Sequence, residues 1–146
     1  MYVDADACPV KNEVYKVADR YGLKVTLVAN SWMRVPMNHR TVLEVVGDAL
    51  DEADDWIVEH VEKDDVVVTA DILLAGRCLE KGASVIGNTG KLFDESNIGM
   101  AVATRELMAD LREAGEVTGG PAPMGKKDRS RFLQVMDHVV QAARRG

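Results

Sequence analysis

Short apolar runs rich in valine alternate along this chain with segments of helical periodicity, and this alternation constrains the fold more than any other feature. It is clearest in residues 64–90, DDVVVTADILLAGRCLEKGASVIGNTG, where we expect a buried strand over 66–69, a helix over 72–81 and a short strand over 83–86. Strands that alternate with helices form a parallel sheet with helices on both faces. The sequence therefore predicts an α/β fold, a three-layer sandwich with a central, mainly parallel sheet.

The other segments continue this pattern. A strand runs into a helix at DADACP, with Pro9 at the first helical position and Gly22 closing the helix, and KVTLVANS has the continuous apolar character of a strand buried on both faces. The remaining expected elements are a short strand (TVLEVV), a helix (DEADDWIVEHVEK), helices around 98–114 and 128–145, and a loop rich in glycine and proline over 115–127. A chain of this length is expected to form a single domain, residues 1–146.

Composition excludes several classes of protein. No apolar stretch approaches the roughly 18 residues of a membrane span, and the start of the chain lacks the basic region, apolar stretch and small-residue site of a secretory signal. Cys8 and Cys78 lie far apart and beside no histidine, so they lack the spacing of a zinc site and suit a reducing compartment. We expect a cytoplasmic protein that does not span a membrane.

Charge is distributed unevenly along the chain. Residues 123–146 contain six Lys or Arg and two Asp, a net charge of +4, which leaves −10 for the rest of a chain whose total is −6. A basic segment can contact phosphate, whereas an acidic body repels it except where a cation is bound. A solvated helix face explains the same asymmetry.

Polar side chains follow the predicted strands at the point where each strand ends. In an open parallel sheet, ligands bind beyond the carboxyl ends of the strands. The residues at these positions are Asp4, Asp6, Asn30, Ser31, Asp71, Asn88 and Thr89. Three further acids, Asp51, Asp54 and Asp55, crowd the first turn of a predicted helix.

The acids at this edge need a positive partner. Carboxylates as close as Asp4 and Asp6 raise each other's pKa, and a buried carboxylate without a partner is strongly disfavoured. Mg²⁺ and Mn²⁺ prefer carboxylate and water oxygens as ligands. We therefore expect one of these ions to bind here, and the candidate ligands are Asp4, Asp6, Asp51, Asp54 and Asp71.

Most of these acids also have a structural interpretation. Asp6 would interact with the N-terminus of the following helix, Asp51 and Asp54 would form the cap and acidic first turn of another, and Asp71 in TAD would cap the helix that begins at Ile72. Asp4 resists such an interpretation, because it directly follows an apolar run that should be buried.

No nucleophile with an adjacent base is visible. Cys8 is predicted to be a small buried residue, because neighbouring aspartates raise the pKa of a thiol and weaken it as a nucleophile. The histidines, His39, His60 and His138, are scattered, so the sequence shows no Ser-His or Cys-His pair.

Seven motifs together resemble one known family. In their order along the chain, VDADACPVK, VAN, DEADDWI, VVTADILLA, KGA, GGPAP and KDRSRF resemble the YaiI/YqxD family of bacterial proteins, over almost the whole chain. That family looks like a branch of the PIN-like superfamily, many of whose members are metal-dependent nucleases, so the resemblance implies a PIN-like fold. It also implies that Asp4 and Asp71 match the acids that follow two of the PIN-like strands. Asp54 is the implied middle acid, with Asp51 or Asp55 as alternatives.

The activity implied by this resemblance is divalent-metal-dependent hydrolysis of phosphodiesters, in RNA more readily than in DNA. Asp4, Asp54 and Asp71 would hold one or two Mg²⁺ or Mn²⁺ ions, and Asp6 a metal-bound water or a second ion. Asp6 and Cys8 belong to the family's own motif rather than to the usual PIN-like pattern. Candidate substrate-binding residues are Asn30, Ser31, Lys126, Lys127 and Arg129, of which the cations would contact the nucleic-acid backbone.

Two alternative functions remain open at this stage. A PIN-like fold can bind RNA or a protein partner without cutting it, because fold does not determine function. DADAC after an apolar strand also partly imitates the haloacid-dehalogenase phosphatase motif, with Cys8 in the place of the usual threonine and Thr69 as the strand-end hydroxyl. An ion pair between Asp4 and Arg34 or Arg105 would favour the binding function over metal chemistry.

Overall fold

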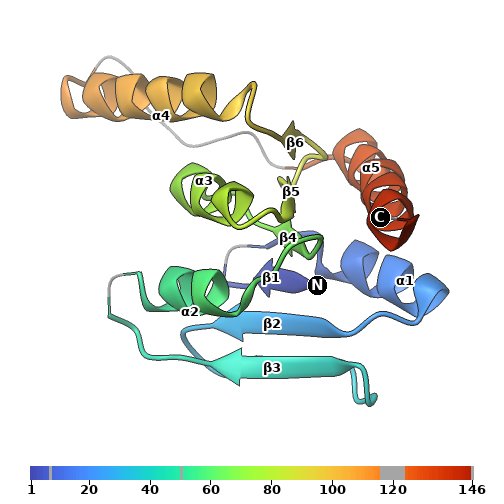
Figure 1. The fold of residues 1–146 in the computed structure, drawn as a ribbon. Coiled ribbons are helices and arrows are strands. Elements are labelled where there is room, and N and C mark those ends of the chain that lie inside the picture. The colour runs from blue at the N-terminus through green and yellow to red at the C-terminus, as the bar shows by residue number, and fades with distance from the viewer. Residues whose placement is uncertain (7, 50, 116–123, 146) are drawn as a thin grey trace.

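The computed structural model contains the expected alternation of strands and helices, and it describes residues 1–6, 8–49, 51–115 and 124–145. The strands are β1 (Tyr2–Asp4), β2 (Val25–Ala29), β3 (Thr41–Val45), β4 (Val66–Val68), β5 (Ser84–Ile86) and β6 (Leu92–Phe93). The helices are α1 (Lys11–Tyr21), α2 (Glu52–His60), α3 (Ile72–Glu80), α4 (Ile98–Glu113) and α5 (Lys126–Arg145). Figure 1 shows their arrangement in space.

The strands described here form one sheet in the order β3-β2-β1-β4-β5-β6. Neighbouring strands are parallel except β5 and β6, which are antiparallel. The order along the chain reverses between β1 and β4, and the helices that follow these two adjacent strands leave toward opposite faces of the sheet (Figure 1). Such a reversal opens a crevice at the carboxyl ends of the two strands, which is where ligands bind in sheets of this type.

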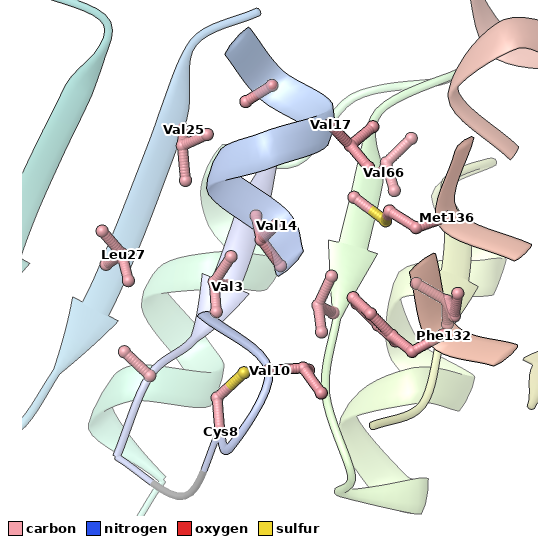
Figure 2. Close-up of a cluster of buried hydrophobic side chains, with 14 of the residues drawn as sticks. Val3, Cys8, Val10, Val14, Val17, Val25, Leu27, Val66, Phe132 and Met136 are labelled. Atoms are coloured by element: carbon pink, nitrogen blue, oxygen red, sulfur yellow. The ribbon is translucent and has the colours of Figure 1, made fainter. Parts of the chain in front are cut away.

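Helices cover both faces of the sheet, with α1 and α5 on one face, α2 and α3 on the other, and α4 beside α3 (Figure 1). Successive residues of a strand serve opposite faces, so Leu27 packs into the core under α1 and α5 while Val28 packs into the core under α2 and α3. Figure 2 shows the first core, where Val14 of α1 and Phe132 of α5 are fully buried. The predicted three-layer sandwich with a mainly parallel sheet is confirmed.

The observed boundary of α1 corrects one prediction. The helix begins at Lys11 rather than at Pro9, because the preceding turn buries both Cys8 and Val10 in the core. Gly22 closes the helix with a left-handed φ of 64°, as predicted. Cys8 is a buried free thiol whose pKa is raised mainly by burial, which fits a structural role.

Two further differences concern the C-terminal half. The basic helix starts at Lys126 rather than at 128, because the carboxylate of Asp128 accepts the N–H of Gly125 at 3.2 Å and so stabilises an earlier first turn. The expected loop over 115–127 is therefore shorter at its end, and its residues 116–123 lie outside the described residues. Strand β6 was not predicted, because two residues are too few to form a periodic pattern.

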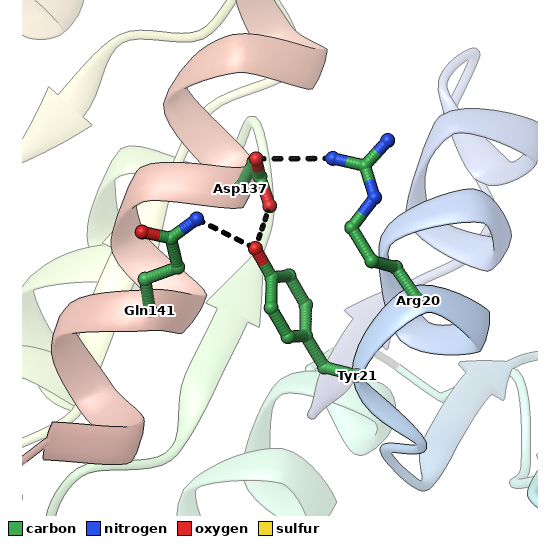
Figure 3. Close-up of polar contacts among 4 residues, drawn as sticks. All are labelled: Arg20, Tyr21, Asp137 and Gln141. Carbon is green, nitrogen blue, oxygen red and sulfur yellow. Dashed lines mark hydrogen bonds and ion pairs between the residues drawn. The ribbon is translucent and has the colours of Figure 1, made fainter.

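A cluster of polar side chains connects α5 to the end of α1 (Figure 3). The hydroxyl of Tyr21 donates to the carboxylate of Asp137 and accepts from the amide of Gln141 at 2.7 Å, and Arg20 pairs with Asp137 at 3.1 Å. The guanidinium of Arg144 lies over the ring of Tyr21, 5.0 Å from its centroid. These contacts fix the position of the basic C-terminal helix against α1.

None of the helices in the described ranges has both the length and the apolar character that crossing a bilayer requires.

Candidate functional site

Asp4 and Thr69 meet where the strand order of the sheet reverses, between β1 and β4. Asp4 is the last residue of β1, and Thr69 directly follows β4, the adjacent strand. The Thr69 hydroxyl donates to a carboxylate oxygen of Asp4 at 2.9 Å and accepts the backbone N–H of Asp71 at 3.0 Å. Thr69 is only 1% exposed, and its two hydrogen bonds hold the ends of the two strands together.

Asp71 caps α3, as its structural interpretation predicted. One carboxylate oxygen accepts the N–H groups of Leu73 at 2.9 Å and Leu74 at 3.2 Å. The second carboxylate oxygen accepts no hydrogen bond from the residues that the structure describes. Asp71 therefore combines a structural contact with a carboxylate oxygen that can still bind a ligand.

Asp6 connects the ends of β1 and β2, and among the described residues its side chain makes no hydrogen bond to the N-terminus of α1. Its carboxylate accepts the backbone N–H of Asn30 at 2.8 Å, and the Asn30 amide donates to the carbonyl of Gly47 at 2.8 Å. Val10, not Asp6, occupies the N-cap position of α1. Asn30 thus links the loops that follow three neighbouring strands.

The first turn of α2 brings further acids to the same edge. Asp51 stands at the N-cap position with a φ of 65°, but its side chain makes no capping hydrogen bond, so the predicted cap is absent. Asp55 forms an ion pair with Arg77 at 2.9 Å, so its carboxylate already has a cationic partner. A pocket of about 280 Å³ lies between α2 and the sheet edge, and its lining includes Asp4, Asp6, Asn30, Asp48, Asp51 and Asp54.

The carboxylates in this acidic pocket repel one another. Burial and, after it, the charges of Asp71, Asp4 and Asp51 together raise the pKa of Asp54 to about 6, while Arg77 opposes them. Burial also raises the pKa of Asp4; the hydrogen bond from Thr69 lowers it, and the charges of Asp71 and Asp6 add to the increase. The mutual effects place Asp4, Asp54 and Asp71 within electrostatic reach of one another.

No cation neutralises Asp4 in the part of the chain that the structure describes. Neither Arg34 nor Arg105, the two candidates considered from the sequence, forms an ion pair there. The ion pair that would have favoured a binding function over metal chemistry at Asp4 is therefore not found among the described residues.

Comparison with known proteins establishes the relationship of this chain. Residues 2–142 match the family described as "Uncharacterized BCR, YaiI/YqxD family". The chain belongs to the YaiI/YqxD family. It is 54% identical to a UPF0178 protein of Rhodospirillum rubrum over 147 residues, which cover 100% of this chain and 98% of the relative. The resemblance predicted from the motifs is confirmed.

Further relatives of this YaiI/YqxD chain carry the same UPF0178 name. One from Rhodopseudomonas palustris is 52% identical over 141 residues, which cover 97% of this chain and 86% of the relative. Another from Nitrobacter winogradskyi is 51% identical over 145 residues, covering 99% and 92%. No solved structure matches this chain at a significant level.

The acidic pocket of this YaiI/YqxD protein suits a divalent cation by its chemistry. Within residues 1–6, 8–49, 51–115 and 124–145, however, no three His, Cys, Asp or Glu side chains are gathered closely enough to hold one ion. Mg²⁺ commonly keeps several waters and binds through one or two carboxylates together with substrate phosphates. The residues present therefore fit a hydrated ion shared with a substrate rather than an ion enclosed by the protein alone.

The remaining candidate residues from the sequence are spread over the same edge and its surroundings. The guanidinium of Arg129 makes structural contacts: it donates to the carbonyl of Pro9 at 2.7 Å and lies 3.6 Å from the carboxylate of Glu13. Lys126 and Lys127, at the start of α5, and Ser31, after β2, are exposed. Their role in substrate binding stays a prediction.

A cationic groove that includes Ile72, the residue after Asp71, was missed from the sequence. It has a volume of about 370 Å³, begins at Ile72 and is lined by Lys91, Arg105 and Arg112, with no acid among the described lining residues. None of the three cations forms an ion pair within the described ranges. The spacing of Arg105 and Arg112, two helical turns apart on one face of α4, was the available signal.

Proposed function

We propose that this protein hydrolyses phosphodiester bonds, in RNA more readily than in DNA, with a divalent cation bound at the acidic pocket. One observation carries the proposal. Asp4 ends β1 and Asp71 lies just after β4, the two strands that flank the reversal of the sheet; Thr69 joins the two acids, and no described cation neutralises Asp4. A sheet edge of this kind is a ligand-binding position, and uncompensated carboxylates there favour a cation.

Asp4, which lines the pocket, and Asp71, through the carboxylate oxygen that does not cap α3, would hold the ion, and Thr69 would keep Asp4 in place. A bound Mg²⁺ or Mn²⁺ supplies stabilisation of the negative charge that develops on phosphorus and on the leaving oxygen. Asp54 would accept the proton that the attacking water loses, because a carboxylate with a pKa of about 6 is ionised at pH 7 to 8 and still basic enough.

The reaction balances as a simple hydrolysis. The water oxygen forms a new bond to phosphorus, the bond from phosphorus to the leaving ribose oxygen breaks, and the leaving oxygen takes a proton from solvent. The cations of the groove at Lys91, Arg105 and Arg112 would bind flanking phosphates beside Asp71. The groove includes the residue after Asp71, and this position supports a polymeric substrate over a small phosphate ester.

Calorimetric titration with Mn²⁺ tests the ion site, and cleavage of a labelled single-stranded RNA in Mn²⁺ tests the activity. Asp4→Asn should abolish both while leaving the circular-dichroism spectrum unchanged. Asp110→Asn, at an exposed acid on α4, makes the same chemical change outside the pocket and should alter neither. Ion binding and cleavage that survive in Asp4→Asn would exclude this site.

A further inference from the structure

The connection between β2 and β3 has an unusual form. Because these strands are parallel, residues 30–40 must return from the carboxyl end of β2 to the amino end of β3. Crossovers of this kind usually contain a helix. Here residues 32–37 have no regular secondary structure, so this part of the crossover is irregular chain.

Side chains of this crossover alternate between the core and solvent. Met33 and Val35 are partly buried against the core under α1. Trp32, just before them, is 76% exposed, Arg34, between them, is exposed, and further along Met37 is completely exposed. Inward anchoring by Met33 and Val35 therefore fixes a segment that presents an aromatic ring and a guanidinium to solvent.

Charge gives this segment its chemical character. Residues 31–40, SWMRVPMNHR, contain two arginines and a histidine and no acid, in a chain whose total charge is −6. Arg40 is paired with Asp19 at 2.6 Å, whereas Arg34 has no ion pair within the described ranges. An exposed tryptophan beside an unpaired arginine is suited to a ligand with flat aromatic rings and negative charge.

Position connects the segment to the acidic pocket. Asn30 lines that pocket and is held by Asp6, and Trp32 follows only two residues later. Two residues of extended chain span at most about 7 Å. A ligand that contacts Trp32 is thus close to the part of the acidic pocket that Asn30 lines.

We propose that Trp32 and Arg34 form a base-stacking site for single-stranded nucleic acid, which positions the strand beside the acidic pocket. The inference rests on the proposed function and names its substrate class. Aromatic rings bind unpaired bases irrespective of sequence, and arginine binds the phosphates or stacks on the bases. Arg34 interrupts the exposed apolar side chains, whereas protein-docking surfaces are contiguous apolar patches, so nucleic acid is the better match.

Trp32 fluorescence tests the proposal directly, because the chain has two tryptophans. Trp56→Phe keeps an aromatic ring against His60, on which Trp56 stacks at 3.7 Å, and leaves Trp32 as the single reporter. Titration of this variant with a twelve-residue oligouridylate in EDTA should give saturable quenching. The same sequence in a duplex should quench much less, because its bases are already stacked.

Affinity measurements add matched controls. Trp32→Ala should weaken oligouridylate binding roughly five-fold to a hundred-fold, and Trp32→Phe should retain most of it. Leu107→Ala, which removes another exposed apolar side chain, on α4, should bind like the unmodified protein. Saturable binding without quenching, or equal affinity in Trp32→Ala, would overturn the proposal, as would quenching that depends only on protein concentration and so reports self-association.

Work in EDTA separates this proposal from the proposed function. If oligouridylate quenches Trp32 fluorescence but the protein binds no Mn²⁺, the stacking site is supported and only the proposed hydrolysis is overturned. Mn²⁺ binding and RNA cleavage without quenching of Trp32 would overturn the stacking site alone.

Discussion

The hydroxyl of Thr69 donates a hydrogen bond of 2.9 Å to the carboxylate of Asp4 and accepts the N–H of Asp71 at 3.0 Å. One buried side chain thereby joins the ends of β1 and β4 at the reversal of the sheet. The same bond lowers the pKa of Asp4 against the effect of burial. Thr69 is consequently a positioning residue for the proposed ion ligand.

Thr69→Val removes the hydroxyl with little change of shape. It leaves an Asp4 oxygen and the Asp71 N–H without their partner, so we expect a loss of about 1–3 kcal/mol in the free energy of unfolding and a further rise in the pKa of Asp4. Urea denaturation and carboxyl-carbon NMR titration measure the two effects. Thr69→Ser retains the hydroxyl and should restore most of the stability; a Val variant as stable as the Ser variant would contradict this role.

Asp71 can be divided into its two roles by a pair of variants. Asp71→Ala removes the cap of α3 and should cost roughly 1 kcal/mol of unfolding free energy, because the N–H groups of Leu73 and Leu74 lose their acceptor. Asp71→Asn keeps an equally good capping side chain but removes the charge, so stability should be preserved while Mn²⁺ affinity falls. Unchanged Mn²⁺ affinity in Asp71→Asn would limit Asp71 to capping.

The architecture was predictable because it depends on periodicity. Valine-rich runs such as Val66–Val68 and the helix that ends at Gly22 follow from alternation, spacing and a left-handed closing residue, and each was found as expected. The start of α1 was misplaced because burial of Cys8 and Val10 outweighs the preference of Pro9 for a first helical turn. Tertiary packing, which a local pattern does not contain, decided that boundary.

The candidate site was predictable only in part. The rule that polar residues at strand ends share one edge correctly placed Asp4, Asp6 and Asn30 around one pocket. The individual contacts were not predictable, because the bond of Asp6 to Asn30 and the ion pair of Asp55 with Arg77 depend on distances between segments far apart in the chain. The alternation of buried and exposed side chains in the β2 to β3 crossover was missed, because this segment is not a strand and a two-residue period is expected only in strands.

Asp54 should make stability depend on pH. Its pKa is raised from 3.8 to about 6, so between these values the folded state binds a proton that the unfolded state lacks, and stability falls as pH rises. Asp54→Asn removes the repulsion and should gain about 1 kcal/mol above pH 6 and nothing below pH 4, a value reduced for the partial exposure of the side chain.

Urea denaturation at pH 4 and pH 8 measures this difference. Glu106→Gln, at an exposed acid on α4, makes the same chemical change outside the pocket and should leave the difference near zero. Added salt at pH 8 should reduce the gain in Asp54→Asn because it screens the repulsion. A gain of equal size at both pH values would show that packing, rather than charge, limits stability at this position.

The cationic groove should determine how strongly nucleic-acid binding depends on salt. Each phosphate contact of a single strand contributes about −0.7 to the slope of the logarithm of the binding constant against the logarithm of salt concentration. Replacing Lys91, Arg105 and Arg112 together with Ala should therefore make the slope less negative by about 2. The matched control replaces Lys16, Lys63 and Lys81 with Ala, which removes the same charge on α1 and at the amino ends of β4 and β5. An equal change of slope in both triple variants would mean that the net charge of the protein, and not the groove beside Asp71, governs binding.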